Sequence, residues 1–161
     1  MLFRIIPESL ITKVNETELV VYLKNGSIIQ LNGAYEPDAL RGAGPVGVVF
    51  DEFAKVKYDA WGVVEPILRA NDGWAWFIGT PKGKNHLHRF YLRGQQGHAE
   101  WQSWLLRATE SGVIDRVQLE ESRKTMTQAD FNQEWECEFL EGVGAVFRGV
   151  REVVGAEPEE P

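Results

Sequence analysis

The sequence predicts a single α/β domain with a mainly parallel sheet, an antiparallel hairpin near its start and helices near its end. Two apolar runs of strand length, residues 46–50 and 74–78, enclose a segment in which apolar residues recur at helical spacing. A strand, a helix and a second strand in this order are typical of parallel pairing with a right-handed crossover. Asn25-Gly26, which separates two runs of β-forming residues, indicates the hairpin.

Size and composition fit this fold class. The 161 residues are the usual size of one domain, and 43% hydrophobic with 25% charged residues is ordinary for a globular protein. Apolar runs extend for only a few residues, whereas a bilayer span needs about 20, so we expect neither a membrane segment nor a secretory leader. The single cysteine, Cys137, excludes an internal disulfide and is expected to be a small core residue.

The elements of the first half follow from local patterns. The hairpin strands fall within residues 18–23 and 27–31, and residues 33–45 read as a loop because they combine glycine, proline and polar side chains. Residues 46–50 are apolar without alternation, as in a strand buried on both faces, and residues 74–78 repeat that pattern.

Between these strands we expect a helix that Asp59 caps and that Pro66 interrupts, because proline removes a hydrogen-bond donor from the helix. In the second half the patterns predict a helix over residues 86–93, a strand over 101–108, and helices over 115–125 and 128–140, listed here in chain order.

Charge is unevenly distributed along the chain. Residues 1–129 contain 15 basic and 15 acidic side chains, so the formal net charge of −7 arises within residues 130–161. An acidic total argues against indiscriminate binding along nucleic acid. Residues 73–99 nevertheless contain no acid, which indicates a local cationic segment that either contacts DNA or phosphate or is a solvated face; its candidate contacts are Lys82, Lys84, Arg89 and Arg93.

Asp51-Glu52 directly follows the apolar run 46–50. Ligands of open parallel sheets bind beyond the carboxyl ends of the strands, and nucleoside triphosphatases place carboxylates there to hold Mg²⁺ and to polarise the attacking water. Asp51 is therefore a candidate metal ligand and Glu52 a candidate base. The alternative is that the pair caps the next helix or lies in an ordinary surface loop.

Gly79-Thr80-Pro81 follows the second apolar run. If the two strands are parallel neighbours, this segment leaves the sheet at the same edge as Asp51-Glu52. The Thr80 hydroxyl is then placed to hydrogen-bond a phosphate or a catalytic water. The alternative is a simple turn.

Several short motifs occur together in a fixed order, and this ordered set resembles the ATPase domain of phage terminase large subunits over residues 1–150. The motifs are Asn25-Gly26-Ser27, Leu40-Arg41-Gly42, Val48-Val49-Phe50-Asp51-Glu52, Phe77-Ile78-Gly79-Thr80-Pro81-Lys82-Gly83-Lys84-Asn85, Phe131-Asn132-Gln133-Glu134-Trp135 and Val146-Phe147. Residues 151–161 form an acidic tail outside the resemblance, which we expect to be disordered.

The resemblance implies a partial P-loop NTPase of the additional-strand, catalytic-glutamate type, from a bacteriophage or prophage motor that drives DNA into capsids. Asp51 matches the Walker B aspartate and Glu52 the catalytic glutamate. Gly79-Thr80-Pro81 matches the motif that couples hydrolysis to DNA movement. Arg41 is similar in place to an arginine that some members offer to the nucleotide of a neighbouring subunit.

The sequence departs from the family because it contains no G-x-x-x-x-G-K-[ST] motif. In the family that loop lies upstream of this stretch, and an RNase H-like nuclease domain lies downstream. We therefore expect the chain alone to hydrolyse ATP negligibly and to bind no cofactor tightly, whereas the complete motor uses ATP and Mg²⁺.

The implied partners are double-stranded viral DNA, the capsid portal, the terminase small subunit, and other large subunits or a separate P-loop-containing half. The implied location is the bacterial host cytoplasm, at the capsid during assembly. Two alternatives stay open: a fragment of a helicase-like DNA translocase, and a non-catalytic remnant that binds DNA or a partner chain.

Overall fold

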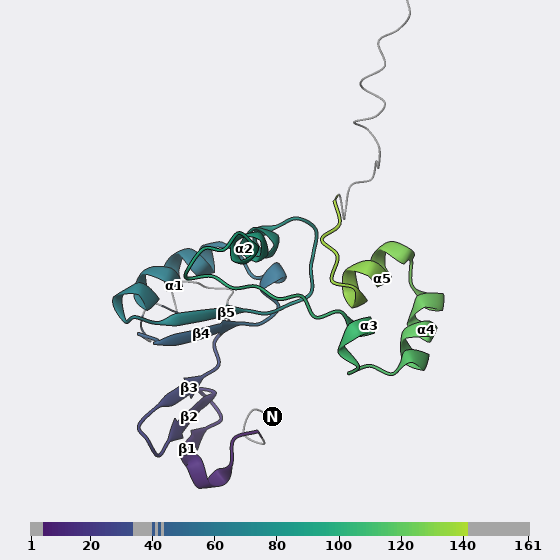
Figure 1. The fold of residues 1–161 in the computed structure, drawn as a ribbon. Coiled ribbons are helices and arrows are strands. Elements are labelled where there is room, and N and C mark those ends of the chain that lie inside the picture. Colours follow the sequence, from purple (N-terminus) through teal and green to yellow (C-terminus); the bar gives the residue numbers. More distant parts are fainter. Residues whose placement is uncertain (1–4, 34–39, 41, 43, 142–161) are drawn as a thin grey trace, which may run out of the picture. The chain divides into compact units, whose positions relative to one another are not determined.

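The computed structural model describes residues 5–33, 40, 42 and 44–141 (Figure 1). Arg41 and the acidic tail 151–161 lie outside the described residues. The chain divides into two compact units, residues 1–47 with 57–74 and residues 48–56 with 75–161. Each unit is described by itself. No helix among the described residues combines the length and the apolar character that crossing a membrane requires.

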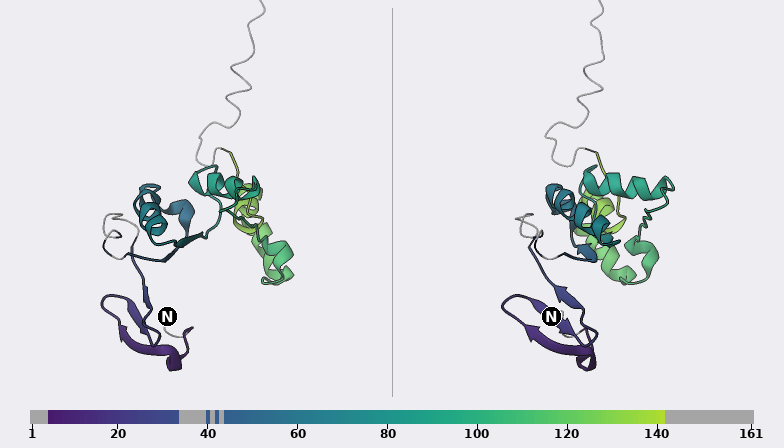
Figure 2. Two further views of the ribbon diagram at one scale, coloured as in Figure 1. Left: turned by 60° about the vertical axis from the view of Figure 1, so that its left-hand side comes forward. Right: turned by 90° about the vertical axis from the view of Figure 1, so that its left-hand side faces the viewer.

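The first unit contains a three-stranded antiparallel sheet in the order β1-β2-β3 (Figures 1 and 2). The strands are β1 (Ile11–Asn15), β2 (Val20–Leu23) and β3 (Ile28–Gln30), and a short 3₁₀ helix, η2 (Glu8–Leu10), precedes them. Strand β1 was not predicted, because its sequence ITKVN is mostly polar. The β2–β3 pairing confirms the predicted hairpin.

The hairpin turn differs in detail from a two-residue turn. Leu23 N–H donates to Ser27 O at 2.8 Å, and Gly26 N–H donates to Leu23 O at 3.0 Å. The loop therefore has three residues, Lys24 to Gly26. Gly26 has φ +86°, a left-handed conformation that closes such loops and that glycine adopts most easily.

Strands β4 (Gly47–Phe50) and β5 (Trp74–Phe77) form a separate two-stranded sheet. Trp74 N–H donates to Val46 O at 3.0 Å and Ile78 N–H donates to Phe50 O at 2.9 Å. Both bonds join residues at the same sequence offset and run in the same direction along the chain, so the pair is parallel, as predicted.

The predicted burial of these strands on both faces is wrong. Phe50 is 5% exposed, but Val49 is 52% exposed and Trp76 is 61% exposed. Successive strand residues point to opposite faces, so one face of the pair is packed and the other is open. Among the described residues the sheet has only these two strands.

Helix α1 (Asp59–Ala70) lies between these strands in the sequence and runs continuously through Pro66, so the predicted interruption is wrong. Proline removes the donor that would reach the Gly62 carbonyl. Gly62 and Pro66 are both exposed, so water can satisfy that carbonyl. Asp59 is the first helical residue and Tyr58 the N-cap, without a side-chain cap bond. The buried side chains of α1 are Ala60, Trp61, Val64 and Leu68.

The second unit contains helices α2 (His86–Gln95), α3 (Ala108–Ser111), α4 (Arg116–Thr125) and α5 (Gln128–Trp135) (Figure 1). Helices α2 and α4 confirm the predictions. Helix α5 ends at Trp135, earlier than expected, and the short α3 was not predicted.

The strand predicted over residues 101–108 is wrong. Residues 101–107 belong to no strand, and α3 begins at Ala108. The segment contacts α2 instead: Ser103 Oγ donates to Tyr91 O at 2.7 Å. A Cβ added at Gly94 of α2 would lie 2.6 Å from Ser103 N, so the absence of a side chain there permits this approach.

Aromatic rings form the core of the second unit. Phe53 is fully buried, and its ring centroid lies 4.6 Å from that of Phe77 and 5.5 Å from that of Phe90. Trp101 closes the cluster, with its centroid 4.9 Å from Phe90. Phe53 immediately follows the acidic pair, so the core holds the loop that carries the candidate site.

Candidate functional site

The structure brings together the two loops that the sequence singled out. Asp51-Glu52 follows β4, and Gly79-Thr80-Pro81 follows the neighbouring strand β5. A Cβ built on Gly79 would lie 3.2 Å from Glu52 Cα and 3.2 Å from Phe53 N. Gly79 also has φ +154°, which side-chain-bearing residues rarely adopt. The close approach and the backbone conformation both require glycine here.

A bulge at the end of β4 displaces the acidic pair. After Ile78 N–H donates to Phe50 O, a regular parallel ladder would continue with Glu52 N–H donating to Ile78 O. Phe53 N–H makes that bond instead, at 2.9 Å. Glu52 N–H is left without its ladder partner and donates to Asp51 Oδ1 at 3.0 Å. One extra residue is thus accommodated, and such bulges redirect side chains near functional sites.

Glu52 has an unusual backbone conformation, with φ 50° and ψ 41°. This left-handed region costs a residue with a side chain about 1 to 2 kcal/mol. Its carboxylate forms an ion pair with Lys55 Nζ at 2.8 Å, and the two side chains are 49% and 65% exposed. The hydrogen bond and the negative charge of Glu52 raise the pKa of Lys55. Exposed pairs of this kind exchange readily with other partners.

The acidic pair does not cap a helix through its side chains. Glu52 is the N-cap residue of the 3₁₀ helix η4 (Phe53–Lys55) but makes no side-chain cap bond. The next helix, α1, has Tyr58 as its N-cap. Asp51 and Glu52 are both exposed. The helix-cap alternative therefore lacks support, and the carboxylates are accessible to a ligand.

Asn85, the last residue of the motif over residues 77–85, and His86, which follows it, hold η4 in place. Asn85 Nδ2 donates to Ala54 O at 3.0 Å, and His86 Nε2 lies 2.7 Å from Phe53 O. Asn85 is also the N-cap of α2, where its Oδ1 accepts from Leu87 N–H at 3.0 Å. Asparagine before a helix is a recognisable cap signal, but no local pattern reveals the bonds to residues 53 and 54.

The remaining candidates are distributed as follows. Thr80 is half-buried and Pro81 is buried. Lys84 forms an ion pair with Glu141, and the Arg93 guanidinium lies 4.5 Å from the Trp101 ring centroid. Of the four predicted DNA or phosphate contacts, Lys82, Lys84 and Arg89 are exposed and Arg93 is half-buried.

The oxygen atoms at this edge fit a magnesium ion. Among the described residues, no group of three or more His, Cys, Asp or Glu side chains could hold a metal. Mg²⁺ typically takes only one or two protein carboxylates and completes its shell with water and phosphate oxygens. Asp51 Oδ1 already accepts the Glu52 N–H, which leaves Asp51 Oδ2 as the ligand atom that fits.

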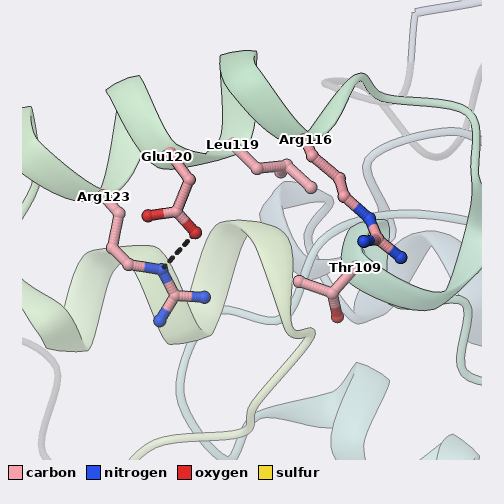
Figure 3. A pocket seen from close by; sticks show the side chains of 5 residues that line it. All are labelled: Thr109, Arg116, Leu119, Glu120 and Arg123. Atoms are coloured by element: carbon pink, nitrogen blue, oxygen red, sulfur yellow. Dashed lines mark ion pairs between the residues drawn. The ribbon is translucent and has the colours of Figure 1, made fainter.

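A cavity of about 310 Å³ lies in the second unit and is lined by none of the predicted residues. In Figure 3, Arg116 and Arg123 stand on either side of Leu119 along α4. Arg123 is engaged by two acids, Glu120 at 3.9 Å and Glu136 at 3.8 Å. The lining residues are Thr109, Arg116, Leu119, Glu120 and Arg123.

No family model matches the sequence. The terminase large subunit of Thermus phage G20c is 32% identical over an alignment of 132 residues, and the match covers 73% of this chain and 27% of that protein. The terminase large subunit of Escherichia phage T5 is 31% identical over an alignment of 137 residues, and the match covers 83% of this chain and 31% of that protein. The chain thus spans less than a third of the length of these relatives.

Solved structures agree with the sequence relatives. The large terminase ATPase domain of Thermus phage P74-26 superposes with a TM-score of 0.67 at 25% identity, covering 83% of this chain and 65% of that one. The large terminase of a thermophilic bacteriophage gives a TM-score of 0.65 at 15% identity, covering 80% and 33%. The second likeness concerns the fold alone.

Proposed function

We propose that this chain, which is related in sequence and in fold to the ATPase domain of phage terminase large subunits, supplies the hydrolytic half of a motor that packages viral DNA. The observation that carries the proposal is the meeting of the Asp51-Glu52 and Gly79-Thr80 loops at one edge of the parallel strands β4 and β5. An edge with accessible carboxylates and a hydroxyl is suited to a magnesium-bound triphosphate.

Asp51 would hold Mg²⁺ through Oδ2, and the bound ion would supply positive charge beside the phosphates of ATP. Glu52 orients a water in line with the γ-phosphate and accepts its proton, so its carboxylate must first leave the ion pair with Lys55. The hydroxyl of Thr80 senses the phosphate, and Gly79 and Pro81 transmit the change along the chain. Arg41 is proposed to act on the nucleotide of a neighbouring subunit.

The chain needs a partner to complete this site. Its sequence contains no G-x-x-x-x-G-K-[ST] motif, the loop that cradles the phosphates in P-loop NTPases. The sheet has an open face that carries Val49, Trp76 and Ile78, which are 52%, 61% and 47% exposed. Apolar surface of this kind is suited to being covered. We propose that a P-loop-containing polypeptide, or another large subunit, packs there, and that the isolated chain is inactive and holds ATP and Mg²⁺ only weakly.

The other proposed partners are double-stranded viral DNA, the capsid portal and the small subunit, and the proposed location is the bacterial host cytoplasm, at the capsid. The proposed contacts to DNA phosphates are Lys82, Lys84, Arg89 and Arg93, and the first three are exposed. The alternative functions are a helicase-like translocase fragment and a non-catalytic binding remnant. The open sheet face favours the remnant only if no neighbouring reading frame encodes a P-loop.

The test is ATP turnover by a complex of this chain with a P-loop-bearing terminase polypeptide. Glu52→Gln should abolish turnover and leave nucleotide binding intact, because it removes the base and keeps the shape of the side chain. Glu65→Gln is the matched control, since Glu65 lies on α1 and pairs with Arg69. Unchanged turnover in Glu52→Gln would refute the assignment.

A further inference from the structure

We propose that Asn85 and His86 are positioning residues that hold Glu52 in its working conformation through the backbone of η4. This inference rests on the role proposed for Glu52. It concerns two side chains at the start of α2, neither of which belongs to the acidic pair or to the Gly79-Thr80-Pro81 loop.

The backbone of Phe53 is fixed on both sides by these contacts. Its N–H donates to Ile78 O at 2.9 Å, and its carbonyl lies 2.7 Å from His86 Nε2. The His86 ring also meets the Phe53 ring edge-on, with centroids 4.7 Å apart. Asn85 Nδ2 adds a bond to the next carbonyl, that of Ala54, at 3.0 Å.

Glu52 depends on this anchor because its own backbone is strained. A left-handed conformation of a residue with a side chain persists only where its surroundings fix it. On the strand side the ladder and Gly79 confine Glu52, and on the other side its neighbour is Phe53. If the bonds from Asn85 and His86 are lost, η4 keeps the packing of the Phe53 ring and the bond to Ile78 O, but the carbonyls of Phe53 and Ala54 are no longer held. Glu52 can then relax toward a right-handed or extended conformation that redirects its carboxylate.

The geometry also fixes which ring nitrogen of His86 is the hydrogen-bond donor. A carbonyl oxygen only accepts hydrogen bonds, so Nε2 of His86 must carry the hydrogen. Glutamine places an amide donor near the position of Nε2, whereas leucine retains bulk without a donor. For Asn85, aspartate retains the oxygen that caps α2 but loses the donor to Ala54. Comparing the leucine and glutamine variants of His86 separates positioning from packing, and the aspartate variant of Asn85 separates positioning from helix capping.

The experiment compares His86→Leu, His86→Gln and Asn85→Asp in the full chain by NMR, with the exposed His98→Leu as control. Amide hydrogen exchange at Phe53 reports the anchor. Broadening of the Asp51 and Glu52 signals by Mn²⁺ alone reports the geometry of the carboxylates, which a general loss of stability does not select. Exchange at amides in α4 and α5 serves as the internal reference.

We expect His86→Leu and Asn85→Asp to speed exchange at Phe53 about tenfold, the effect of one lost hydrogen bond. Both should also weaken Mn²⁺ binding, with α4 and α5 unchanged, and His86→Gln should restore both readouts. Wild-type exchange at Phe53 in both donor-less variants would overturn the proposal. If His86→Leu does not fold, Asn85→Asp decides.

The two proposals can fail separately. If excess Mn²⁺ leaves the Asp51 and Glu52 signals of the wild-type chain unchanged, even the weak binding proposed for the isolated chain is absent, and the proposed metal-binding role fails. The exchange and chemical shifts of Glu52 and Phe53 still decide whether Asn85 and His86 hold the loop. If Mn²⁺ binds at Asp51 but is unaffected in every variant, the metal role stands and the positioning role is overturned.

Discussion

Replacing Gly79 by alanine tests whether the two site loops meet as the structure places them. The added Cβ would lie 3.2 Å from Glu52 Cα, 3.2 Å from Phe53 N and 3.3 Å from the Glu52 carbonyl carbon. All three neighbours are backbone atoms, which cannot rotate away. The backbone of Gly79, at φ +154°, is also unfavourable for alanine by about 1 to 3 kcal/mol.

These two effects together should lower the free energy of unfolding by about 2 to 4 kcal/mol. The assay is urea-induced unfolding followed by tryptophan fluorescence. Gly97→Ala is the matched control, because Gly97 has φ +75° but no atom within 4 Å of an added Cβ. Gly97→Ala should lower the free energy of unfolding only by the cost of the backbone conformation, about 1 kcal/mol.

The difference between the two variants measures the close approach alone. If Gly79→Ala costs no more than Gly97→Ala, the β4 and β5 loops do not touch. The shared edge on which the proposed function depends would then be wrong.

Two further predictions concern α1 and Cys137. Gly62→Ala should stabilise the chain by about 0.5 to 1 kcal/mol in the same urea assay, because Gly62 is helical and an added Cβ meets nothing within 4 Å. Burial is the main cause that raises the pKa of the Cys137 thiol, so its alkylation should accelerate at higher pH in the folded chain than in urea. The same pKa shift sets how stability changes with pH. At low pH the Cys137 thiol is neutral in the folded and the unfolded chain. As pH rises above the ordinary thiol pKa, the thiol ionises first in the unfolded chain, so the contribution of Cys137 to the free energy of unfolding is lost.

The sequence predicted those elements whose signals are local. The apolar runs at residues 46–50 and 74–78 became β4 and β5, and the pairing through Val46 and Trp74 is parallel. The secondary-structure prediction failed where the conformation of a segment depends on the element that it packs against. Residues 101–108 have the composition of a strand, but a strand exists only if another strand accepts its hydrogen bonds. Here Ser103 bonds to the backbone of α2 instead.

The predicted burial of β4 and β5 on both faces was the other error, and it also arose because burial depends on a packing partner. An apolar run indicates a strand that is covered on both faces, yet it does not say which polypeptide covers it. Trp76, at 61% exposed, and Val49, at 52% exposed, show that the described residues cover one face only. The pattern in the sequence is suited to a larger sheet than the two strands found here.

The candidate site was likewise predictable only in part from the sequence. That Asp51-Glu52 and Gly79 share one edge follows from strand order alone, because parallel neighbours end on the same side. The displacement of Glu52 does not follow, because it arises from a one-residue bulge whose bonds join Phe53 to Ile78. A regular ladder would bind the Glu52 N–H to Ile78 O.

The bulge also explains why Asp51 and Glu52 can have different roles although they are adjacent. Asp51 uses Oδ1 to satisfy the Glu52 N–H that the bulge releases, so its second oxygen is held in a defined direction, as a metal ligand requires. The carboxylate of Glu52 takes no part in the strand ladder, and its ion pair with Lys55 is exposed and therefore exchangeable. The fixed carboxylate of Asp51 suits the proposed metal binding, and the exchangeable carboxylate of Glu52 suits the proposed activation of water. The backbone irregularity, in addition to the residue types, is what would separate the two proposed roles.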